Sequence, residues 1–539
     1  MYPSARSLRL ALGSALALLL LLPAALGAAT ATKRPNFVII LADDLGYGDV
    51  QCYNPARGKI PTPHLDRLAA QGMRFTDGHS SSGVCSPSRY TLLTGRYHWR
   101  TRLQTGIVDL WEHPLIAPDR LTLAGLAQAQ GYVTAAFGKW HLGWDWPITA
   151  EQRPLVRGLG GRQGRAQGTL ITQPTPAQRE AWAAIFAQRI RGGPTTRGFE
   201  RYFGTDVPNW PPYAFIDNDR TVGIPTELLP AREFDGFRGS LQGPALPGWR
   251  FEEILGTLAD RASAYIRERA ARTEPFLIYL PLTTPHTPIV PSAKWQGRSG
   301  LNDYADLVME TDDAVGRVLA ALDHAGVAPN TLVLFSSDNG YEAGIGVKPL
   351  EAMGHFPSGP LRGYKRDVHE GGHRVPFVVR WPGVVKAGTV CDQLVHHADV
   401  LATLADVLGA TLPANAGEDS FSFLSLLRGG TAPIRPHAVS CAASGMPGVR
   451  SGQWKLIYPA TAAAGAGFEL YDLAADLGET RNLAAEHPAR VAELKALYEQ
   501  LLARGRSTPG PTQANDVEVR RFPQPASAGM KAAKKQSED

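Results

Sequence analysis

The chain has 539 residues, of which 44% are hydrophobic and 19% are charged. This length and apolar content allow a large hydrophobic core, indicate more than one domain and exclude a disordered chain. The net charge of +5 includes Arg6 and Arg9 near the N-terminus, and the remainder is too small to indicate nucleic-acid binding. We therefore expect no nucleic-acid partner.

The first residues have the pattern of an export signal. Arg6 and Arg9 precede an almost entirely apolar run at 10–22, and small residues follow it. This order is typical of a cleavable signal peptide, which we place at 1–31, with an uncleaved N-terminal anchor as the alternative. No other run has the length of a bilayer span, so we expect no stable membrane span after cleavage. The sequence has no Asn-x-Ser/Thr sequon, which favours a bacterial periplasmic or secreted protein.

Short apolar runs alternate with amphipathic stretches along most of the chain. The apolar runs have the length of buried strands, and the amphipathic stretches carry apolar residues at helical spacing. This alternation predicts an α/β fold with a large, mostly parallel β-sheet sandwiched by helices. In chain order the predicted elements are strand 37–41, helix 63–71, helix 121–130, strand 132–137, strand 276–280, helix 302–324, strand 332–335, strand 375–379 and helix 398–408.

The pattern changes in two regions. Between residues 146 and 247 Gly, Pro, Arg and aromatic residues dominate, with one helical stretch near 177–190, so we expect long loops that shape a substrate cleft. Residues 429–436 indicate a hinge. The predicted divisions are an N-terminal domain at 33–432, a smaller C-terminal α+β subdomain at 437–504 with strands 454–458 and 468–471 and a closing helix at 487–504, and a flexible tail at 505–539.

Chemically useful residues directly follow four of the predicted strands. In an open α/β sheet, ligands bind beyond the carboxyl ends of the strands. The four groups of residues could therefore meet at one edge of one sheet. They are Asp43 with Asp44, Lys139 with His141, His286 in a Thr-Pro-His turn, and Asp338 with Asn339.

Two of these groups offer only oxygen ligands. The three carboxylates of Asp43, Asp44 and Asp338 would repel one another unless a cation lay among them. Hard oxygen ligands suit calcium or magnesium and not zinc. Asp43 and Asp44 alone could form an ordinary turn, but Asn339 beside Asp338 after a second strand favours a metal site.

Cys85 lies before a predicted helix at 90–95. Pro87 near the start of that helix indicates a helix N-terminus, whose free N–H groups and positive dipole attract anions. Cys85 would thus lie where an anionic substrate is held, with Arg89 one turn further along. The alternative is a packed structural cysteine.

The segment Cys-Ser-Pro-Ser-Arg at 85–89, with its Thr-Gly helix, resembles the signature of the type I, formylglycine-dependent sulfatases (arylsulfatase-like) of the alkaline phosphatase superfamily. Further blocks are similar to those of the family and occur in its order. They lie at 36–44, 138–143, 285–286, 337–340, 363–372 and 471–473. The resemblance implies an alkaline phosphatase-like fold and a sulfuric ester hydrolase.

The resemblance also implies a modified nucleophile and a metal ion. A formylglycine-generating enzyme would oxidise Cys85 to formylglycine, and the aldehyde would hydrate to a geminal diol. Asp43, Asp44, Asp338 and Asn339 would bind calcium, with magnesium less favoured, and the ion would also touch the diol at position 85.

The remaining roles implied by the resemblance belong to five basic residues. Arg89 and Lys139 would stabilise the diol, and Lys365 would grip the sulfate. His286, with Lys365 nearby, would protonate the leaving alcohol, and His141 would deprotonate the second hydroxyl of the diol. That second hydroxyl explains the need for an aldehyde, because a plain serine would keep a sulfate ester that water attacks slowly.

We predict a sulfatase acting on sulfated carbohydrate, with small aryl sulfates as the second candidate. A phosphate or phosphonate ester hydrolase on the same fold and a secreted binding protein are the alternatives, and the completeness of the blocks disfavours both. His355 is a candidate substrate contact because it precedes Lys365 closely, and Asp206, Asn209 and Arg220 are weaker candidates. The sequence leaves open the exact substrate, exo or endo action, the oligomeric state and the disulfide state of the other cysteines, Cys52, Cys391 and Cys441.

Overall fold

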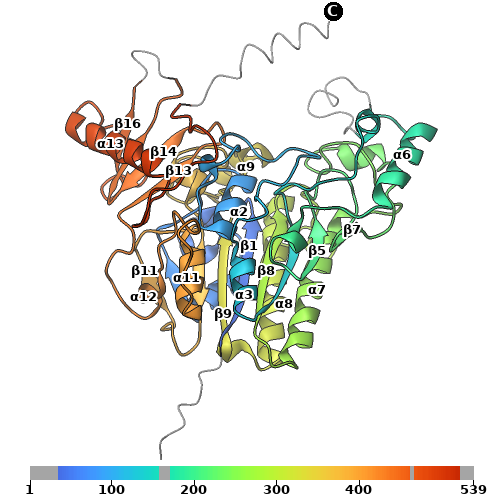
Figure 1. Ribbon diagram of the computed structural model, residues 1–539, viewed down its shortest axis with the longest axis horizontal. Coiled ribbons are helices and arrows are strands. Elements are labelled where there is room, and N and C mark those ends of the chain that lie inside the picture. The colour runs from blue at the N-terminus through green and yellow to red at the C-terminus, as the bar shows by residue number, and fades with distance from the viewer. Residues whose placement is uncertain (1–33, 157–169, 462–466, 523–539) are drawn as a thin grey trace, which may run out of the picture. The chain divides into compact units, whose positions relative to one another are not determined.

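A computed structural model describes residues 34–156, 170–461 and 467–522 (Figure 1). The predicted signal peptide at 1–31 lies outside the described residues, as does the end of the predicted tail from 523 onward. Within the described ranges, no helix has the length and apolar character needed to cross a membrane.

A ten-stranded sheet forms the centre of the molecule (Figure 1), in the order β11-β2-β10-β9-β1-β8-β4-β5-β6-β7. Its long central strands run parallel to their neighbours, and antiparallel pairs join the shorter strands on either side. The predicted mostly parallel sheet is confirmed. The strands are β1 (Asn36–Asp43), β2 (Met73–Phe75), β4 (Val133–Lys139), β5 (Arg201–Thr205), β6 (Ile216–Asp217), β7 (Arg220–Thr221), β8 (Phe276–Pro285), β9 (Thr331–Ser337), β10 (Phe377–Arg380) and β11 (Thr389–Cys391).

Alternating side chains of the central strands build one apolar core on each face of the sheet. Ile40 of β1 and Ile278 of β8 point into one core, and Ile39 and Tyr279 point into the other. This alternation is the consequence of the two-residue period of a strand. The first core is closed by α1 (Pro63–Ala70), α7 (Ile254–Ala270) and α8 (Asp303–His324), and the second by α2 (Cys85–Thr94), α3 (Leu123–Ala129) and α11 (Asp399–Leu408).

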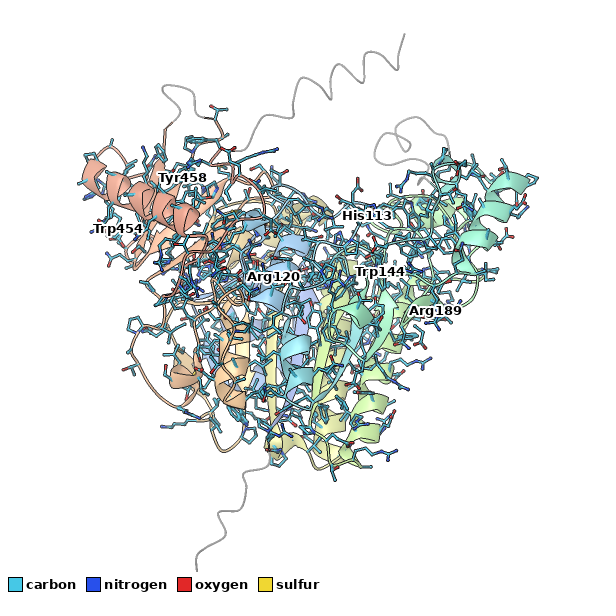
Figure 2. All side chains as sticks on the ribbon, in the orientation of Figure 1. His113, Arg120, Trp144, Arg189, Trp454 and Tyr458 are labelled. Atoms are coloured by element: carbon cyan, nitrogen blue, oxygen red, sulfur yellow. The ribbon has the colours of Figure 1, made fainter. Side chains whose placement is uncertain are left out.

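The smaller C-terminal subdomain is an antiparallel sheet covered by a helix, which is the predicted α+β unit. Its strands are β13 (His437–Cys441), β14 (Pro447–Ser451), β15 (Trp454–Ile457) and β16 (Glu469–Asp472), and its helix is α13 (Pro488–Arg504). Figure 2 labels Trp454, the first residue of β15, and Tyr458, which directly follows that strand. The subdomain also holds the segment that precedes Cys85 in the chain. The Cys441 N–H donates to the Ser81 carbonyl at 2.9 Å, and the Gly83 N–H donates to the Cys441 carbonyl at 2.9 Å.

Residues 505–522 differ from the predicted flexible tail. The Asp516 carboxylate accepts a hydrogen bond from the Arg96 guanidinium at 3.0 Å, and Val519 lies in the core of the C-terminal subdomain. The Arg506 side chain is also buried and donates to Thr508. The tail prediction is wrong for this part, because individual ion pairs and caps fix a segment that has no hydrophobic period.

The region between 146 and 247 is mostly irregular, as predicted, and contains α6 (Pro176–Phe186) near the expected helix. Aromatic packing holds its base, since Trp144 (Figure 2) contacts Trp140, Trp146 and Tyr202. The remaining short elements are β3 (Gly78–His79), α4 (Arg153–Val156), α9 (Val347–Ala352), α10 (Glu370–His373), β12 (Val395–His396) and α12 (Leu424–Leu427).

Buried histidines give the fold a predictable pH dependence. Burial lowers the pKa of His98 and of His397 to about 3, and burial followed by the charge of Arg435 lowers that of His437 to about 4. In the unfolded chain these groups titrate near 6.5. Between the folded and unfolded pKa values, the unfolded chain binds more protons than the folded chain. The contribution of these histidines to the free energy of unfolding is therefore fully present above pH 6.5 and is lost as the pH falls toward 4.

We expect the variant His98→Gln to resist acid better than the parent protein. Its unfolding free energy should fall less between pH 7 and pH 5, by about 2 kcal/mol, because one buried proton acceptor is gone. Denaturant titrations of both proteins at the two pH values measure the difference. An identical fall in both proteins would show that His98 takes no part in acid destabilisation.

Candidate active site

Four neighbouring parallel strands carry the predicted site residues to one edge of the large sheet. Asp43 ends β1, Lys139 ends β4, His286 follows β8, and Asp338 follows β9. The prediction that these groups meet is therefore confirmed. A glycine is required at position 340, beside them, because a Cβ there would lie 1.9 Å from the carbonyl oxygen of Gly371, in the segment that carries Lys365.

The acidic part of the site is a compact, buried group. The Asn339 side-chain N–H donates to the Asp44 carboxylate at 2.7 Å, and the Asp44 backbone N–H donates to Asp338 at 3.2 Å. Asp44 has a left-handed backbone, with φ of 65°. The side-chain oxygen of Asn339 is buried and has no hydrogen-bond partner.

Each of the three carboxylates is paired with a buried cation, and Arg89 also lies 3.4 Å from Asp43. Arg89 donates to Asp338 at 2.7 and 3.0 Å, Lys139 donates to Asp43 at 2.7 Å, and Lys365 donates to Asp44 at 2.6 Å. Although burial raises it, the nearby Lys139 lowers the pKa of Asp43 well below its usual range. Burial raises the pKa of Asp338 to about 7, helped by the charge of Asp43. The site therefore combines strong positive and strong negative charge in one small volume.

Cys85 is the first residue of α2 and lies against this charged group. Its sulfur is 3.5 Å from the Asp43 carboxylate, and only 2% of the residue is exposed. Burial raises the pKa of the Cys85 thiol well above its usual range. Since the thiolate is the nucleophilic form, the unmodified side chain would be a poor nucleophile at neutral pH.

His141 is held as a neutral proton acceptor. Its Nε2–H donates to the Val108 carbonyl at 3.0 Å, so the lone pair is on Nδ1, which is buried and has no partner. Burial and the charge of Lys139 lower the pKa of His141 well below its usual value. Its backbone is left-handed, with φ of 50°, and the backbone N–H donates to Asp206 at 3.2 Å. Asp206, a weaker candidate in the sequence, therefore supports the position of His141.

His286 faces the same group from the opposite side. Its Nδ1–H donates to the Thr287 carbonyl at 2.5 Å, and its Nε2 lies 3.7 Å from the Asp44 carboxylate. Burial and then the charge of Lys139 lower the pKa of His286 to about 4, so the ring is neutral at pH 7. An anion held by Lys365 would raise this pKa, because it opposes those positive charges.

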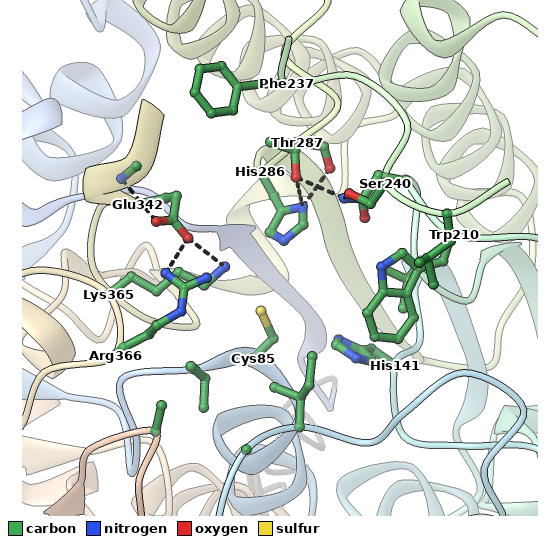
Figure 3. A pocket seen from close by; sticks show the side chains of 18 of the residues that line it. Cys85, His141, Trp210, Phe237, Ser240, His286, Thr287, Glu342, Lys365 and Arg366 are labelled. Carbon is green, nitrogen blue, oxygen red and sulfur yellow. Dashed lines mark hydrogen bonds and ion pairs between the residues drawn. The ribbon is translucent and has the colours of Figure 1, made fainter. Parts of the chain in front are cut away.

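A pocket of about 540 Å³ opens above these residues (Figure 3), and Cys85, His141, His286 and Lys365 line it together. Its size is within the range of small-molecule sites and exceeds what a sulfate group alone would fill. The rest of its lining was missed or ranked low from the sequence, because these residues lie in irregular loops. The main ones are Asn209, Trp210, Phe237, Arg238, Glu342 and Arg366.

Two weaker sequence predictions fall outside this pocket. His355 is fully buried, its Nε2 contacts Asp49 at 2.8 Å, and its Nδ1 accepts the Lys59 backbone N–H at 3.0 Å. Arg220 is exposed and donates to the Ala187 carbonyl. Both ring nitrogens of His355 are engaged, so we correct its prediction as a substrate contact and assign it a structural role.

A second cluster of buried ligand-type side chains lies on β3 and α10, in contact with the C-terminal subdomain. It contains His79, Glu370 and His373, whose ring and carboxylate atoms lie within 4.8 Å of one another. Lys455 donates to Glu370 at 2.9 Å, and Arg374 donates to the same carboxylate at 3.2 Å. These cations already neutralise the carboxylate, so we assign the cluster to the junction of the two units and not to a metal.

Two family models match the chain. The model described as "Sulfatase" matches residues 35–410, and the model described as "N-sulphoglucosamine sulphohydrolase, C-terminal" matches residues 363–506. The first match covers the large sheet and all the site residues described above. The second covers the Lys365 segment and the C-terminal subdomain.

Named relatives cover most of the chain. An N-acetylgalactosamine-6-O-sulfatase of Bacteroides thetaiotaomicron is 32% identical over 88% of this chain and 94% of its own length. Human arylsulfatase A is 32% identical over 76% of this chain and 71% of its own length. A solved structure superposes with a TM-score of 0.74 at 29% identity, covering 87% of this chain and 99% of the other. It is described under the metabolism of multiple glycosaminoglycans by Bacteroides thetaiotaomicron. The chain belongs to the sulfatase family and is a sulfuric ester hydrolase.

Proposed function

We propose that the protein hydrolyses sulfate monoesters of carbohydrates at the pocket above Cys85. The observation that carries this proposal is the meeting of Cys85, three carboxylates and three cations at the base of one pocket. The carbohydrate part rests on the relatives, since an N-acetylgalactosamine-6-O-sulfatase is similar over nearly the whole chain. Aryl sulfates remain the second substrate class, because arylsulfatase A is similar over a smaller share.

We propose that Asp43, Asp44, Asp338 and Asn339 hold a divalent cation, for which calcium fits best. These donors are all oxygen, and the buried Asn339 oxygen lacks any partner, as expected of a ligand atom. The charges of the site also fit. With the ion bound and all three carboxylates ionised, they balance the three cations, so the divalent ion leaves two positive charges, which an ionised hydroxyl and a sulfate ester would neutralise. Such an ion, when bound, supplies Lewis-acid polarisation of a sulfate oxygen.

We propose that a maturation enzyme, which supplies the oxidant, oxidises Cys85 to formylglycine with loss of its sulfur. The aldehyde then adds water to form a geminal diol, so that a hydroxyl replaces the thiol as nucleophile. The raised pKa of the thiol supports this, because the unmodified side chain stays protonated. Lys139 and Arg89 would stabilise negative charge at position 85, and Lys365 would hold the sulfate oxygens. The charges of Lys139 and Lys365 already act on Cys85.

The two histidines would move the protons. The free Nδ1 of His141 would accept a proton from a hydroxyl at position 85, because its Nε2–H is held by the Val108 carbonyl. Nε2 of His286 would give a proton to the leaving alcohol. A sulfate ester bound by Lys365 would raise the pKa of His286 and so load this acid when substrate is present.

A panel of three esters tests the proposed function. The matured protein is assayed with N-acetylgalactosamine 6-sulfate, para-nitrophenyl sulfate and para-nitrophenyl phosphate. We expect the highest kcat/KM for the sulfated sugar and the lowest for the phosphate. Preference for the phosphate would overturn the assignment in favour of phosphate-ester hydrolysis, and preference for the aryl sulfate would overturn the carbohydrate part alone.

We also infer that the chain is exported with residues 1–31 as a leader. The support is the sequence pattern of two arginines, an apolar run and small residues. N-terminal sequencing of the protein recovered outside the cytoplasm checks this. A mature chain beginning near residue 32 is expected, and an intact Met1 would contradict the inference.

A further inference from the structure

Asn209 lines the pocket and has a buried side-chain oxygen without a hydrogen-bond partner. Its side chain is 4% exposed, its amide N–H donates to Ser240 at 2.6 Å and to Thr287 at 3.0 Å, and its amide oxygen has no partner. A buried polar atom without a hydrogen bond costs about 1–3 kcal/mol, so such an atom in a folded protein needs an explanation. Because the amide N–H donates to both hydroxyls, the free atom is the acceptor oxygen.

The residue is held in place independently of any ligand. The Asn209 carbonyl accepts the Ser240 backbone N–H at 2.9 Å, and Ser240 belongs to the loop that carries Phe237 and Arg238 into the same pocket. Thr287, which accepts the other amide N–H, is the neighbour of His286. The amide is therefore fixed between the loop and the segment carrying the proposed acid, and its free atom is fixed with it.

Apolar faces lie beside this acceptor. Trp210 follows Asn209, packs edge-on against the His141 ring at 5.6 Å and lines the pocket (Figure 3). Phe237, which is 46% exposed, lies on the side of His286 in the same view. A ring carrying both C–H faces and hydroxyl or acylamino groups matches such a wall, because it presents apolar area and a hydrogen-bond donor together.

We propose that Asn209 is a specificity residue that accepts a hydrogen bond from a hydroxyl or amide N–H of the sugar bearing the sulfate. This inference rests on the proposed sulfatase function. It predicts discrimination against aryl esters, because an aryl ring has no donor and would leave the Asn209 oxygen without a hydrogen bond. A site built to bond a donor discriminates against ligands that lack one.

The test compares Asn209→Ala with the parent protein on N-acetylgalactosamine 6-sulfate and on para-nitrophenyl sulfate. We expect kcat/KM for the sugar to fall about ten- to a hundredfold and that for the aryl ester to change by less than about threefold. The loss should appear mainly in KM. Asn209→Ser, which restores a side-chain oxygen, should recover part of the activity on the sugar.

The possible outcomes can be told apart. Equal losses on both esters, with a lowered melting temperature, would overturn the inference and make Asn209 a structural residue that holds the loop at Ser240. An unchanged kcat/KM for the sugar would overturn it as well. If the parent protein hydrolyses neither ester after maturation, the proposed function itself has failed, which is a different result from a variant that loses discrimination.

Discussion

Replacing Cys85 by alanine is expected to abolish hydrolysis of sulfate esters, with a loss in kcat on the order of 10⁴-fold or more. The reason is that Cys85 lies against the Asp43 carboxylate, whereas the lining hydroxyls of Ser240 and Thr287 are engaged with Asn209. The cation pairs of the site do not involve Cys85, so the fold should persist. Steady-state rates of the variant measure the loss of activity, and its thermal melt shows whether the fold persists.

A matched control and a second variant sharpen this result. Cys52→Ala removes a cysteine that is also free but lies outside the pocket, so its activity should stay within about twofold of the parent. Cys85→Ser should turn over at most once, because a single hydroxyl leaves a sulfate ester that nothing in the site expels. Mass spectrometry of Cys85→Ser after exposure to substrate would show the added sulfate. Full activity in Cys85→Ala would contradict the proposed nucleophile.

Removal of the divalent cation is expected to have the second largest effect. Dialysis against a chelator should reduce kcat by on the order of 10³-fold, and added calcium should restore it. Calcium should also raise the melting temperature, since an ion at a hundred times its Kd adds about 2.7 kcal/mol to stability. Asp338→Asn, which removes one proposed ligand charge, should lose both the activity and the calcium-dependent shift.

The exposed Asp392 provides the control for this experiment. Asp392→Asn changes the same charge at a distance from the four proposed ligands and should respond to calcium like the parent. Activity that survives complete chelation, together with a melting temperature that calcium does not move, would contradict the cation site. The same shift with magnesium at equal concentration would change the assigned ion and keep the site.

The central sheet and the charged part of the site could be predicted because they depend on local patterns. Apolar runs of strand length gave β1, β4, β8 and β9 within a few residues, and the polar groups that follow them identified the edge where they meet. The helix expected at 90–95 is present as α2, which begins five residues earlier, at Cys85, and Pro87 correctly indicates that a helix starts nearby. These signals need no knowledge of distant contacts.

The pocket walls could not be predicted in the same way. Asn209, Trp210 and Phe237 lie in irregular loops, where no hydrophobic period indicates which side chain faces the substrate. His355 shows the converse error, because its closeness in sequence to Lys365 suggested a substrate contact that its two buried hydrogen bonds disfavour. Neighbours in a loop diverge in space, so position in the sequence is a poor guide there.

The prediction of a flexible tail is wrong at 505–522 for a related reason. Their composition is that of a flexible segment, and the contacts that fix them are single ion pairs to distant residues, such as Asp516 with Arg96. Composition measures the average tendency of a segment and not its individual partners. The sequence identifies Asn209 and Asn339 as candidates but does not show that their side-chain oxygens are unpaired.

The mass of the tryptic peptide 75–89 tests the central claim most directly. The protein is purified from its native host, or from one that expresses the maturation enzyme, and is alkylated before digestion so that a free thiol is marked. We predict a peptide in which the sulfur of Cys85 is replaced by oxygen, as an aldehyde or its hydrate, and which escapes alkylation. A peptide carrying an alkylated thiol at position 85 in every molecule would contradict the formylglycine mechanism.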